Sequence, residues 1–234
     1  MTGKQKVTFS PTPIKKFPNI YSSGKGRRQR FLVKSGAARP IFDEQIISFK
    51  GRKYREVDPN RSKLFAAIAK DISQIGLKED SSVLYLGASH GYTVSFLAEM
   101  VAQGSIYALD FAPRVVRDLV FVAEEFTNVA PIMADANQPQ EYKESLCEEG
   151  VDVVFMDIAQ KDQVGIFLKN CDAFLKKGGF GLLALKARSE DVTKKPRDVF
   201  KQVRKVLDEK EVVVDYRELA PYEKDHALFV MKKK

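Results

Sequence analysis

The chain has 234 residues, of which 44% are hydrophobic and 30% are charged, and its formal net charge is +8. This length and hydrophobic content suit one α/β domain of ordinary size with a modest extension. No apolar run reaches the length of a membrane span and the first residues are polar and basic, which predicts an intracellular protein with no membrane partner. Cys147 and Cys171 lack metal-type spacing, so we expect two buried or half-buried thiols in helices, without a disulfide or zinc site.

The positive charge is concentrated in the first quarter of the chain. Residues 1–60 contain 14 lysines and arginines against four acids, a net charge of +10, whereas residues 61–234 carry 25 basic and 27 acidic residues, a net charge of −2. Lysines spread for solubility would not be so local. The asymmetry favours a polyanionic partner, most simply the phosphates of RNA or DNA.

The N-terminal region lacks helical periodicity. Residues 1–30 are punctuated by prolines and glycines and predict irregular or short-strand structure. Brief extended pieces follow at 31–33, 46–49 and 53–57, with Gly36 and Gly51 as breaks. We therefore predict a small, basic, β-rich subdomain over 1–57 and a second domain over 58–234.

From Asn60 the pattern becomes an alternation of helices and strands. Apolar residues at helical spacing predict a first helix that runs from about residue 60 to Gly76. Five strands then alternate with amphipathic helices, which indicates a mostly parallel sheet covered on both faces. The expected strands are 82–86, 105–109, 129–133, 151–156 and 180–185, and the expected helices lie near 91–102, 112–126, 162–176 and 196–208, with a shorter one around 139–147. The last two β-rich stretches, 211–219 and 226–231, are joined by a loop too short for anything but an antiparallel pair.

Polar residues stand where the predicted parallel strands end, which is where open α/β sheets bind their ligands. One such acid alone would be an ordinary helix cap, but several at one edge of a sheet indicate a site. The set consists of the turn Gly87 to Gly91, Asp110, Asp135, Asp157 and Lys186.

The turn from Gly87 to Thr93 has the character of a nucleotide-binding loop. Its glycines allow close approach of a ligand to the backbone, and the following helix start offers free N–H groups. Asp110 lies about twenty residues past the first glycine, where an acid binds a ribose diol. The spacing suits a dinucleotide or an adenosyl cofactor, and the missing third glycine weakens the nicotinamide alternative without removing it.

Two further residues join the set with less certain roles. Lys63 lies in the first turn of its helix, where the helix dipole disfavours a cation, so both a functional lysine and an ordinary surface lysine fit the sequence. His226 begins the last strand, which the antiparallel pairing brings to the edge that carries Asp157 and Lys186. The alternative for His226 is a hydrogen-bonded loop histidine.

The chain resembles the fibrillarin family through several motifs that occur in the family's order from about residue 20 onward. Its archaeal members are the most similar, since the Gly/Arg-rich tail of eukaryotic members is absent. The motifs are Tyr54–Leu64 (YREVDPNRSKL), the glycine turn, Asp135-Ala136, Val153–Gln160 (VVFMDIAQ), Lys186–Ser189 (KARS) and Glu223–His226 (EKDH). The family turn commonly reads GAASGTT, whereas this chain has GASHGYT, so the contacts of His90 and Tyr92 are left open.

The resemblance implies a class I methyltransferase fold, which is a Rossmann-like α/β fold with a seven-stranded, mostly parallel sheet whose last strand is antiparallel. It implies S-adenosyl-L-methionine as cofactor and no metal. The cofactor positions of the family fall on Gly87, Ala88, Ser89, Gly91, Tyr92, Thr93, Asp110, Phe111, Asp135, Ala136, Asp157 and Gln160. Its catalytic residues fall on Lys63, Asp157, Lys186 and His226.

The resemblance also implies a reaction and an assembly: methyl transfer to the ribose 2′-hydroxyl of rRNA and tRNA in the cytoplasm of an archaeal cell. The partners would be a C/D-box guide RNA, a Nop-domain scaffold protein and a kink-turn-binding ribosomal-type protein. In our mechanistic hypothesis, Lys186 orients or deprotonates the 2′-hydroxyl and Asp157 holds Lys186 in place. His226 positions the ribose or relays the proton. The alternatives are a nicotinamide-dependent oxidoreductase and a non-catalytic RNA-binding module.

Overall fold

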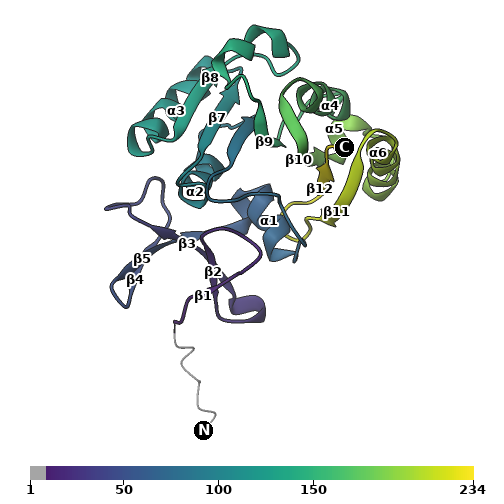
Figure 1. Cartoon of the computed structure of the whole chain (residues 1–234). Helices are drawn as coiled ribbons and strands as arrows, with labels where there is room; N and C mark the ends of the chain where they lie inside the picture. Colours follow the sequence, from purple (N-terminus) through teal and green to yellow (C-terminus); the bar gives the residue numbers. More distant parts are fainter. Residues whose placement is uncertain (1–8) are drawn as a thin grey trace.

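The computed structural model describes residues 9–234, so the basic residues Lys4 and Lys6 lie outside the described range. Its main element is a seven-stranded sheet with the strand order β11-β12-β10-β9-β6-β7-β8 (Figure 1). Only β12 runs against its neighbours. The strands are β6 (Ser82–Leu86), β7 (Ser105–Asp110), β8 (Val129–Met133), β9 (Val151–Met156), β10 (Leu175–Lys186), β11 (Val212–Glu218) and β12 (His226–Lys232). The predicted sheet, including its antiparallel member, is confirmed.

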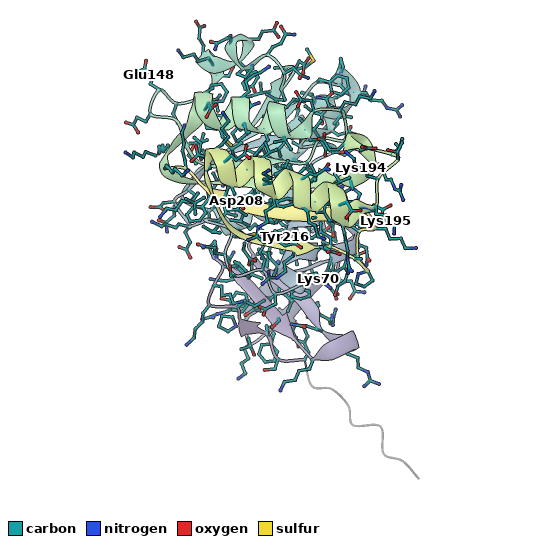
Figure 2. All side chains as sticks on the ribbon, turned by 90° about the vertical axis from the view of Figure 1, so that its right-hand side faces the viewer. Lys70, Glu148, Lys194, Lys195, Asp208 and Tyr216 are labelled. Atoms are coloured by element: carbon teal, nitrogen blue, oxygen red, sulfur yellow. The ribbon has the colours of Figure 1, made fainter. Side chains whose placement is uncertain are left out.

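Helices cover both faces of this sheet because its central strands are apolar on both sides. Figure 1 shows α1 (Lys63–Ala69), α2 (Tyr92–Met100) and α3 (Pro113–Glu125) on one face, and α4 (Gln163–Phe174), α5 (Ala187–Glu190) and α6 (Pro196–Lys210) on the other. Alternate strand residues divide between two cores, for example Tyr85 toward α1 and α2, and Leu84 toward α4. Figure 2 looks onto the second face, with α6 in front and β11 with Tyr216 beside it.

Strand β10 begins earlier than the sequence predicts, within residues expected to end the preceding helix. Leu175 pairs with Val151 of β9, and the register then shifts before Phe180 pairs with Val153. The backbone of Gly178 and Gly179 exchanges hydrogen bonds with Lys233. Pairing with neighbours on both sides therefore holds these residues extended, which local helical periodicity does not reveal.

The first helix is shorter than expected, since α1 ends at Ala69 and the chain continues to Ile75 outside a helix. The carbonyl oxygens of Lys70 and Asp71 accept hydrogen bonds from the guanidinium of Arg217 on β11, and Asp71 has a φ of 57°. Ile72 and Ile75 are nevertheless fully buried. Their spacing was a signal of burial, and a contact from a distant strand ends the helix.

The segment 139–147 also differs from its prediction. It forms two 3₁₀ turns, Pro139–Glu141 and Lys143–Ser145, and Cys147 lies beyond them outside any helix. The half-buried Cys147 and the buried Cys171 are free thiols, as expected. The short helix α5 directly after β10 was not predicted.

The N-terminal residues form a second, antiparallel sheet with the order β1-β2-β3-β5-β4, which lies beneath α1 and α2 in Figure 1. This β-rich character was predicted. Its residues Ile20, Phe31 and Val57 pack in the same core cluster as α1 and α2. The division into domains at residue 57 stays a prediction, because the two sheets share this core. The strands are β1 (Thr12–Pro13), β2 (Ile20–Ser23), β3 (Arg30–Ser35), β4 (Ile46–Phe49) and β5 (Arg52–Val57).

A buried ion cluster joins the N-terminal sheet to α2. The fully buried Arg55 of β5 donates to Glu44 at 2.7 Å and to Glu99 of α2 at 3.1 Å, and its guanidinium stacks on Phe96 at 4.1 Å. Arg55 therefore belongs to the core, although it counted toward the basic excess of the first quarter. The charge that this quarter offers to a partner is smaller than the sequence suggests.

Candidate active site

The carboxyl ends of four parallel strands converge at one edge of the sheet, and the predicted site residues follow them. In register, Leu86 of β6 pairs with Leu109 of β7 and Met156 of β9, and Met156 pairs with Leu183 of β10. The residues that come next are Gly87, Asp110 and Asp157. Lys186 ends β10 directly opposite His226, the first residue of the antiparallel β12. The topology thus brings to one edge residues that are far apart in the chain.

A cavity of about 340 Å³, which we call the smaller cavity, lies beyond β6, β7, β8 and β9. It is lined by eight of the twelve residues assigned to cofactor binding: Gly87, Ser89, Asp110, Phe111, Asp135, Ala136, Asp157 and Gln160. Its walls combine carboxylates with apolar groups such as Leu109 and Ile158. That combination suits a ligand with both a polar sugar and a flat heterocycle.

Gly87 lines the smaller cavity and also a second, larger cavity that adjoins it. Its φ is +77°, and a Cβ atom there would meet the carbonyl oxygen of Asp157 at 2.6 Å. A side chain at this position would therefore clash with the end of β9 as well as strain the backbone. The next turn residues continue the cradle: the N–H of Ser89 donates to Asp110 Oδ2 at 3.1 Å.

Gly91 differs from its expected role, because it lines neither cavity. It is the N-cap of α2 with a φ of 87°, and a Cβ atom there would meet Val122 of α3 at 2.8 Å. Close packing of α2 against α3 accounts for this glycine. Its cofactor-binding role stays a prediction.

His90 and Tyr92, two of the three residues that depart from the family turn, have defined contacts. His90 is exposed, with Nδ1 3.2 Å from Ser89 Oγ and Nε2 3.7 Å from Asp118 of α3. The hydroxyl of Tyr92 accepts a hydrogen bond from the backbone N–H of Asp58 at 3.0 Å, and the guanidinium of Arg61 stacks on its ring at 4.0 Å. Tyr92 thereby links the start of α2 to the segment that precedes α1.

Two of the three acids of the smaller cavity, Asp110 and Asp135, are oriented by backbone hydrogen bonds. Asp110 accepts from the N–H groups of Ser89 and Ala112. Asp135 Oδ1 accepts from the backbone and side-chain nitrogens of Asn137, and the backbone bond is the main cause of a lowered pKa for Asp135. Neither carboxylate is the N-cap of the helix or turn that follows it, and each keeps lone pairs for a ligand.

A second cavity of about 610 Å³, the larger cavity, adjoins the first through Gly87, Ser89, Asp157, Ile158 and Ala159. Lys63, Asp157, Lys186 and His226 all line it, together with the turn residues Ala88, Tyr92 and Thr93. The structure thus places the four predicted catalytic residues around one space. Each comes from a different element: the start of α1, the end of β9, the end of β10 and the start of β12.

Lys63, rather than Lys186, is the ion-pair partner of Asp157. Lys63 Nζ lies 3.3 Å from Asp157 Oδ2, and both side chains are about four-fifths buried, with 24% and 19% of their surfaces exposed. Our expectation that Asp157 holds Lys186 is therefore corrected. The buried amide of Gln163 positions Lys186 instead: its oxygen accepts from Lys186 N at 3.0 Å and its nitrogen donates to Lys186 O at 3.1 Å.

Burial raises the pKa of the Asp157 carboxyl group, and the Lys63 amino group only partly offsets this effect. Burial also raises the pKa of Tyr85, which lines the larger cavity and stacks on Phe155 at 4.4 Å. Tyr85 is therefore a neutral phenol at physiological pH.

Ser62 precedes Lys63 and fixes the start of α1. Its hydroxyl caps α1 by accepting from Phe65 N and also accepts from Thr93 Oγ1 at 3.0 Å.

Two charged residues of the larger cavity, Arg61 and Glu223, were not among the predicted site residues. Both lie inside motifs that the sequence made conspicuous, two residues before Lys63 and three before His226. Glu223 is 3.9 Å from Lys63 Nζ and 3.8 Å from His226 Nδ1. Their closeness in the sequence to Lys63 and His226 was the signal from which both residues could have been predicted.

Within residues 9–234, no group of three or more His, Cys, Asp and Glu side chains is arranged to hold a metal ion. In the same residues, no helix combines the length and apolar character that crossing a membrane requires.

A seven-stranded sheet with one antiparallel strand, and a glycine turn after the strand of that sheet that comes first in the chain, are the features of the class I methyltransferase fold. Comparison with known proteins agrees with this class. The sequence model of the Fibrillarin family matches residues 12–234. The chain belongs to the fibrillarin family.

Individual relatives cover nearly the whole chain. The fibrillarin-like rRNA/tRNA 2′-O-methyltransferase of Methanocaldococcus jannaschii is 44% identical over 217 residues, 92% of this chain and 94% of the relative. The solved Methanococcus jannaschii fibrillarin pre-rRNA processing protein has a TM-score of 0.90 at 42% identity, with 97% and 98% of the two chains covered. Aeropyrum pernix fibrillarin, solved with natively bound S-adenosyl-L-methionine, has a TM-score of 0.85 at 35% identity, covering 95% and 97%. The fibrillarin of a solved fibrillarin/Nop5p complex has a TM-score of 0.84 at 36% identity, covering 93% and 99%.

Proposed function

We propose that this protein methylates ribose 2′-hydroxyls of rRNA and tRNA as the catalytic subunit of a C/D-box guide ribonucleoprotein, in the cytoplasm of an archaeal cell. The protein is an S-adenosyl-L-methionine-dependent RNA 2′-O-methyltransferase, as its relatives of 42–44% identity are. One observation carries the proposal: the smaller cavity, whose mixed polar and apolar lining suits a nucleoside, shares Asp157 with a larger cavity lined by two lysines and two histidines.

The smaller cavity fits S-adenosyl-L-methionine. Asp110, held by two backbone N–H groups, is placed for a ribose diol, and Asp135 with its lowered pKa supplies an ionised acceptor. The crowded Gly87 permits the close approach that a ligand needs at this turn. When bound, the cofactor supplies a methyl group made electrophilic by the sulfonium. Asp157 lines both cavities and supplies negative charge where they meet.

The larger cavity receives the acceptor ribose. Lys186 orients or deprotonates the 2′-hydroxyl, and the Gln163 amide fixes the backbone from which Lys186 extends. The Lys63–Asp157 ion pair lies where the two cavities meet, and His226 lies beside Lys186 across the β10–β12 pairing. The protein therefore mainly aligns the reactants and accepts one proton.

Substrate selection belongs to the assembly in this proposal. A Nop-domain scaffold protein is the direct protein partner, as the complex of a 36% identical fibrillarin with Nop5p supports. A guide RNA and a kink-turn-binding protein complete the particle. The basic residues of the N-terminal quarter contact RNA backbone or the scaffold.

The test is methyl transfer to RNA from labelled S-adenosyl-L-methionine, with and without guide RNA and scaffold, mapped by sequencing that detects 2′-O-methyl groups. We expect methylation at the guided nucleotide only when all components are present. Binding of NAD in place of S-adenosyl-L-methionine by calorimetry would indicate an oxidoreductase. RNA binding without methyl transfer in the complete assembly would indicate a binding module.

A further inference from the structure

Glu223 occupies a central position in the larger cavity. Its Oε1 lies 3.9 Å from Lys63 Nζ and its Oε2 lies 3.8 Å from His226 Nδ1, while its side chain is 22% exposed. Lys63 therefore lies between two carboxylates, because Asp157 is 3.3 Å away on its other side. One acid thus links two of the residues that line the acceptor space.

The imidazole of His226 has acceptors on its Nδ1 side. His226 Nδ1 is 2.6 Å from the carbonyl oxygen of Lys224, and a carbonyl oxygen can only accept. Nδ1 therefore carries the proton, and the Glu223 carboxylate lies on the same side of the ring. In the neutral ring the other nitrogen, Nε2, then has a free lone pair.

The loop that carries these groups is held at both ends. Leu219 N donates to His226 O at 2.9 Å, and Glu223 N donates to Leu219 O at 3.3 Å. Asp225 accepts from Ala187 N through its carbonyl oxygen, and its carboxylate pairs with Arg188 at 3.2 Å. The ring is 12% exposed on its side chain, so it has little freedom to rotate.

We propose that Glu223 is a positioning residue of this site. Its carboxylate, together with the Lys224 carbonyl, holds His226 as the Nδ1–H tautomer, which leaves Nε2 free to accept the proton of a substrate hydroxyl. The same carboxylate links the His226 ring to Lys63. The inference rests on the proposed function for its role in the reaction, whereas the ring geometry stands independently of it. The other charged residues that line the larger cavity are Asp157, Lys186 and Arg61.

The chain contains only two histidines, so ¹⁵N nuclear magnetic resonance of histidine-labelled protein resolves the tautomer directly. His90→Asn assigns the His226 signal. At a pH where the ring is neutral, we expect Nδ1–H to dominate for His226 in the wild type. In Glu223→Gln and Glu223→Ala the Nδ1–H population should fall, although the Lys224 carbonyl retains part of the preference.

Kinetics in the complete assembly provide the second measurement. We expect a roughly tenfold lower kcat in Glu223→Gln with an unchanged KM for S-adenosyl-L-methionine. Glu218→Gln, which removes a carboxylate at the end of β11 that pairs with Arg197 on the surface, serves as matched control and should retain wild-type values. An Nε2–H wild-type ring, or variants with wild-type tautomer and rate, would overturn the proposal. The expected tautomer without methyl transfer would refute the proposed function alone.

Discussion

Lys63 Nζ and Asp157 Oδ2 lie 3.3 Å apart, although one residue begins α1 and the other follows β9. The pair closes the space between the helix and the sheet at the point where the two cavities meet. Burial raises the pKa of Asp157 despite the cation beside it, so the carboxylate is held under an energetic cost. Groups held in this way are concentrated at functional sites.

Replacement of Lys186 should separate catalysis from cofactor binding. In Lys186→Ala the amino group that lines the larger cavity is lost, whereas the smaller cavity does not include this residue. We expect methyl transfer to fall by about 10²-fold or more, with unchanged S-adenosyl-L-methionine affinity by calorimetry. Lys177→Ala, at the exposed opposite end of the same strand, is the control. Full methylation by Lys186→Ala would remove this residue from the mechanism.

A comparison of variants at Gly87 and Gly178 distinguishes the effect of backbone strain from the effect of steric crowding. Their φ angles are +77° and +76°, but a Cβ atom meets Asp157 O at 2.6 Å at Gly87 and nothing within 4 Å at Gly178. Gly178→Ala should cost about 1 kcal/mol of stability from strain alone and leave cofactor affinity unchanged. Gly87→Ala should weaken S-adenosyl-L-methionine binding by at least about tenfold, measured by calorimetry. Equal cofactor affinities for the two variants would contradict the crowding argument.

The raised pKa of Asp157 predicts a signed dependence of stability on pH. Between its unfolded and folded pKa values the native state binds more protons at this residue, so its contribution to the free energy of unfolding falls as pH rises through that interval. Asp157→Asn removes this contribution, and its stability relative to the wild type should therefore increase from about pH 4 upward in urea titrations, while methylation is lost.

Asp135 provides the comparison of opposite sign. The pKa of Asp135 is lowered in the folded state. Its contribution to the free energy of unfolding is therefore present above the pKa that it has in the unfolded chain, and is lost as pH falls through its folded pKa. Asp135→Asn should be less stable than the wild type at neutral pH and approach it in acid. Parallel pH curves for the wild type and both variants would show that these carboxylates do not differ from free ones.

The buried cluster around Arg55 predicts a large loss of stability on truncation. Arg55→Ala leaves Glu44 and Glu99 buried without their cation, at a cost of about 3–5 kcal/mol in the free energy of unfolding. Chemical denaturation measures this value. Arg204→Ala breaks a half-exposed pair with Asp208 within α6 and should change stability by less than about 1 kcal/mol. A small effect at Arg55 would mean that the two glutamates are neutral or hydrated in the variant.

The sequence by itself determined the order of helices and strands, the antiparallel last pair and the residues at the strand ends. Apolar periodicity and glycine breaks are local properties, and parallel strands bring their carboxyl ends to one edge wherever they pair. Gly87, Asp110, Asp157 and Lys186 were therefore predictable as neighbours of one edge. The antiparallel last pair predicted His226 at the same edge, whereas Lys63 was only a candidate until the motif resemblance gave it a catalytic role.

Only the tertiary structure decided which of these side chains touch. It pairs Asp157 with Lys63 instead of Lys186, packs Gly91 against α3, brings Arg217 to the carbonyl oxygens that follow α1 and buries Arg55 among acids. These outcomes depend on strand order, register and the packing of helices against the sheet, which join residues far apart in the chain. A sequence pattern specifies the face or edge on which a residue lies, whereas a distance of 3.3 Å depends on how all the elements pack together.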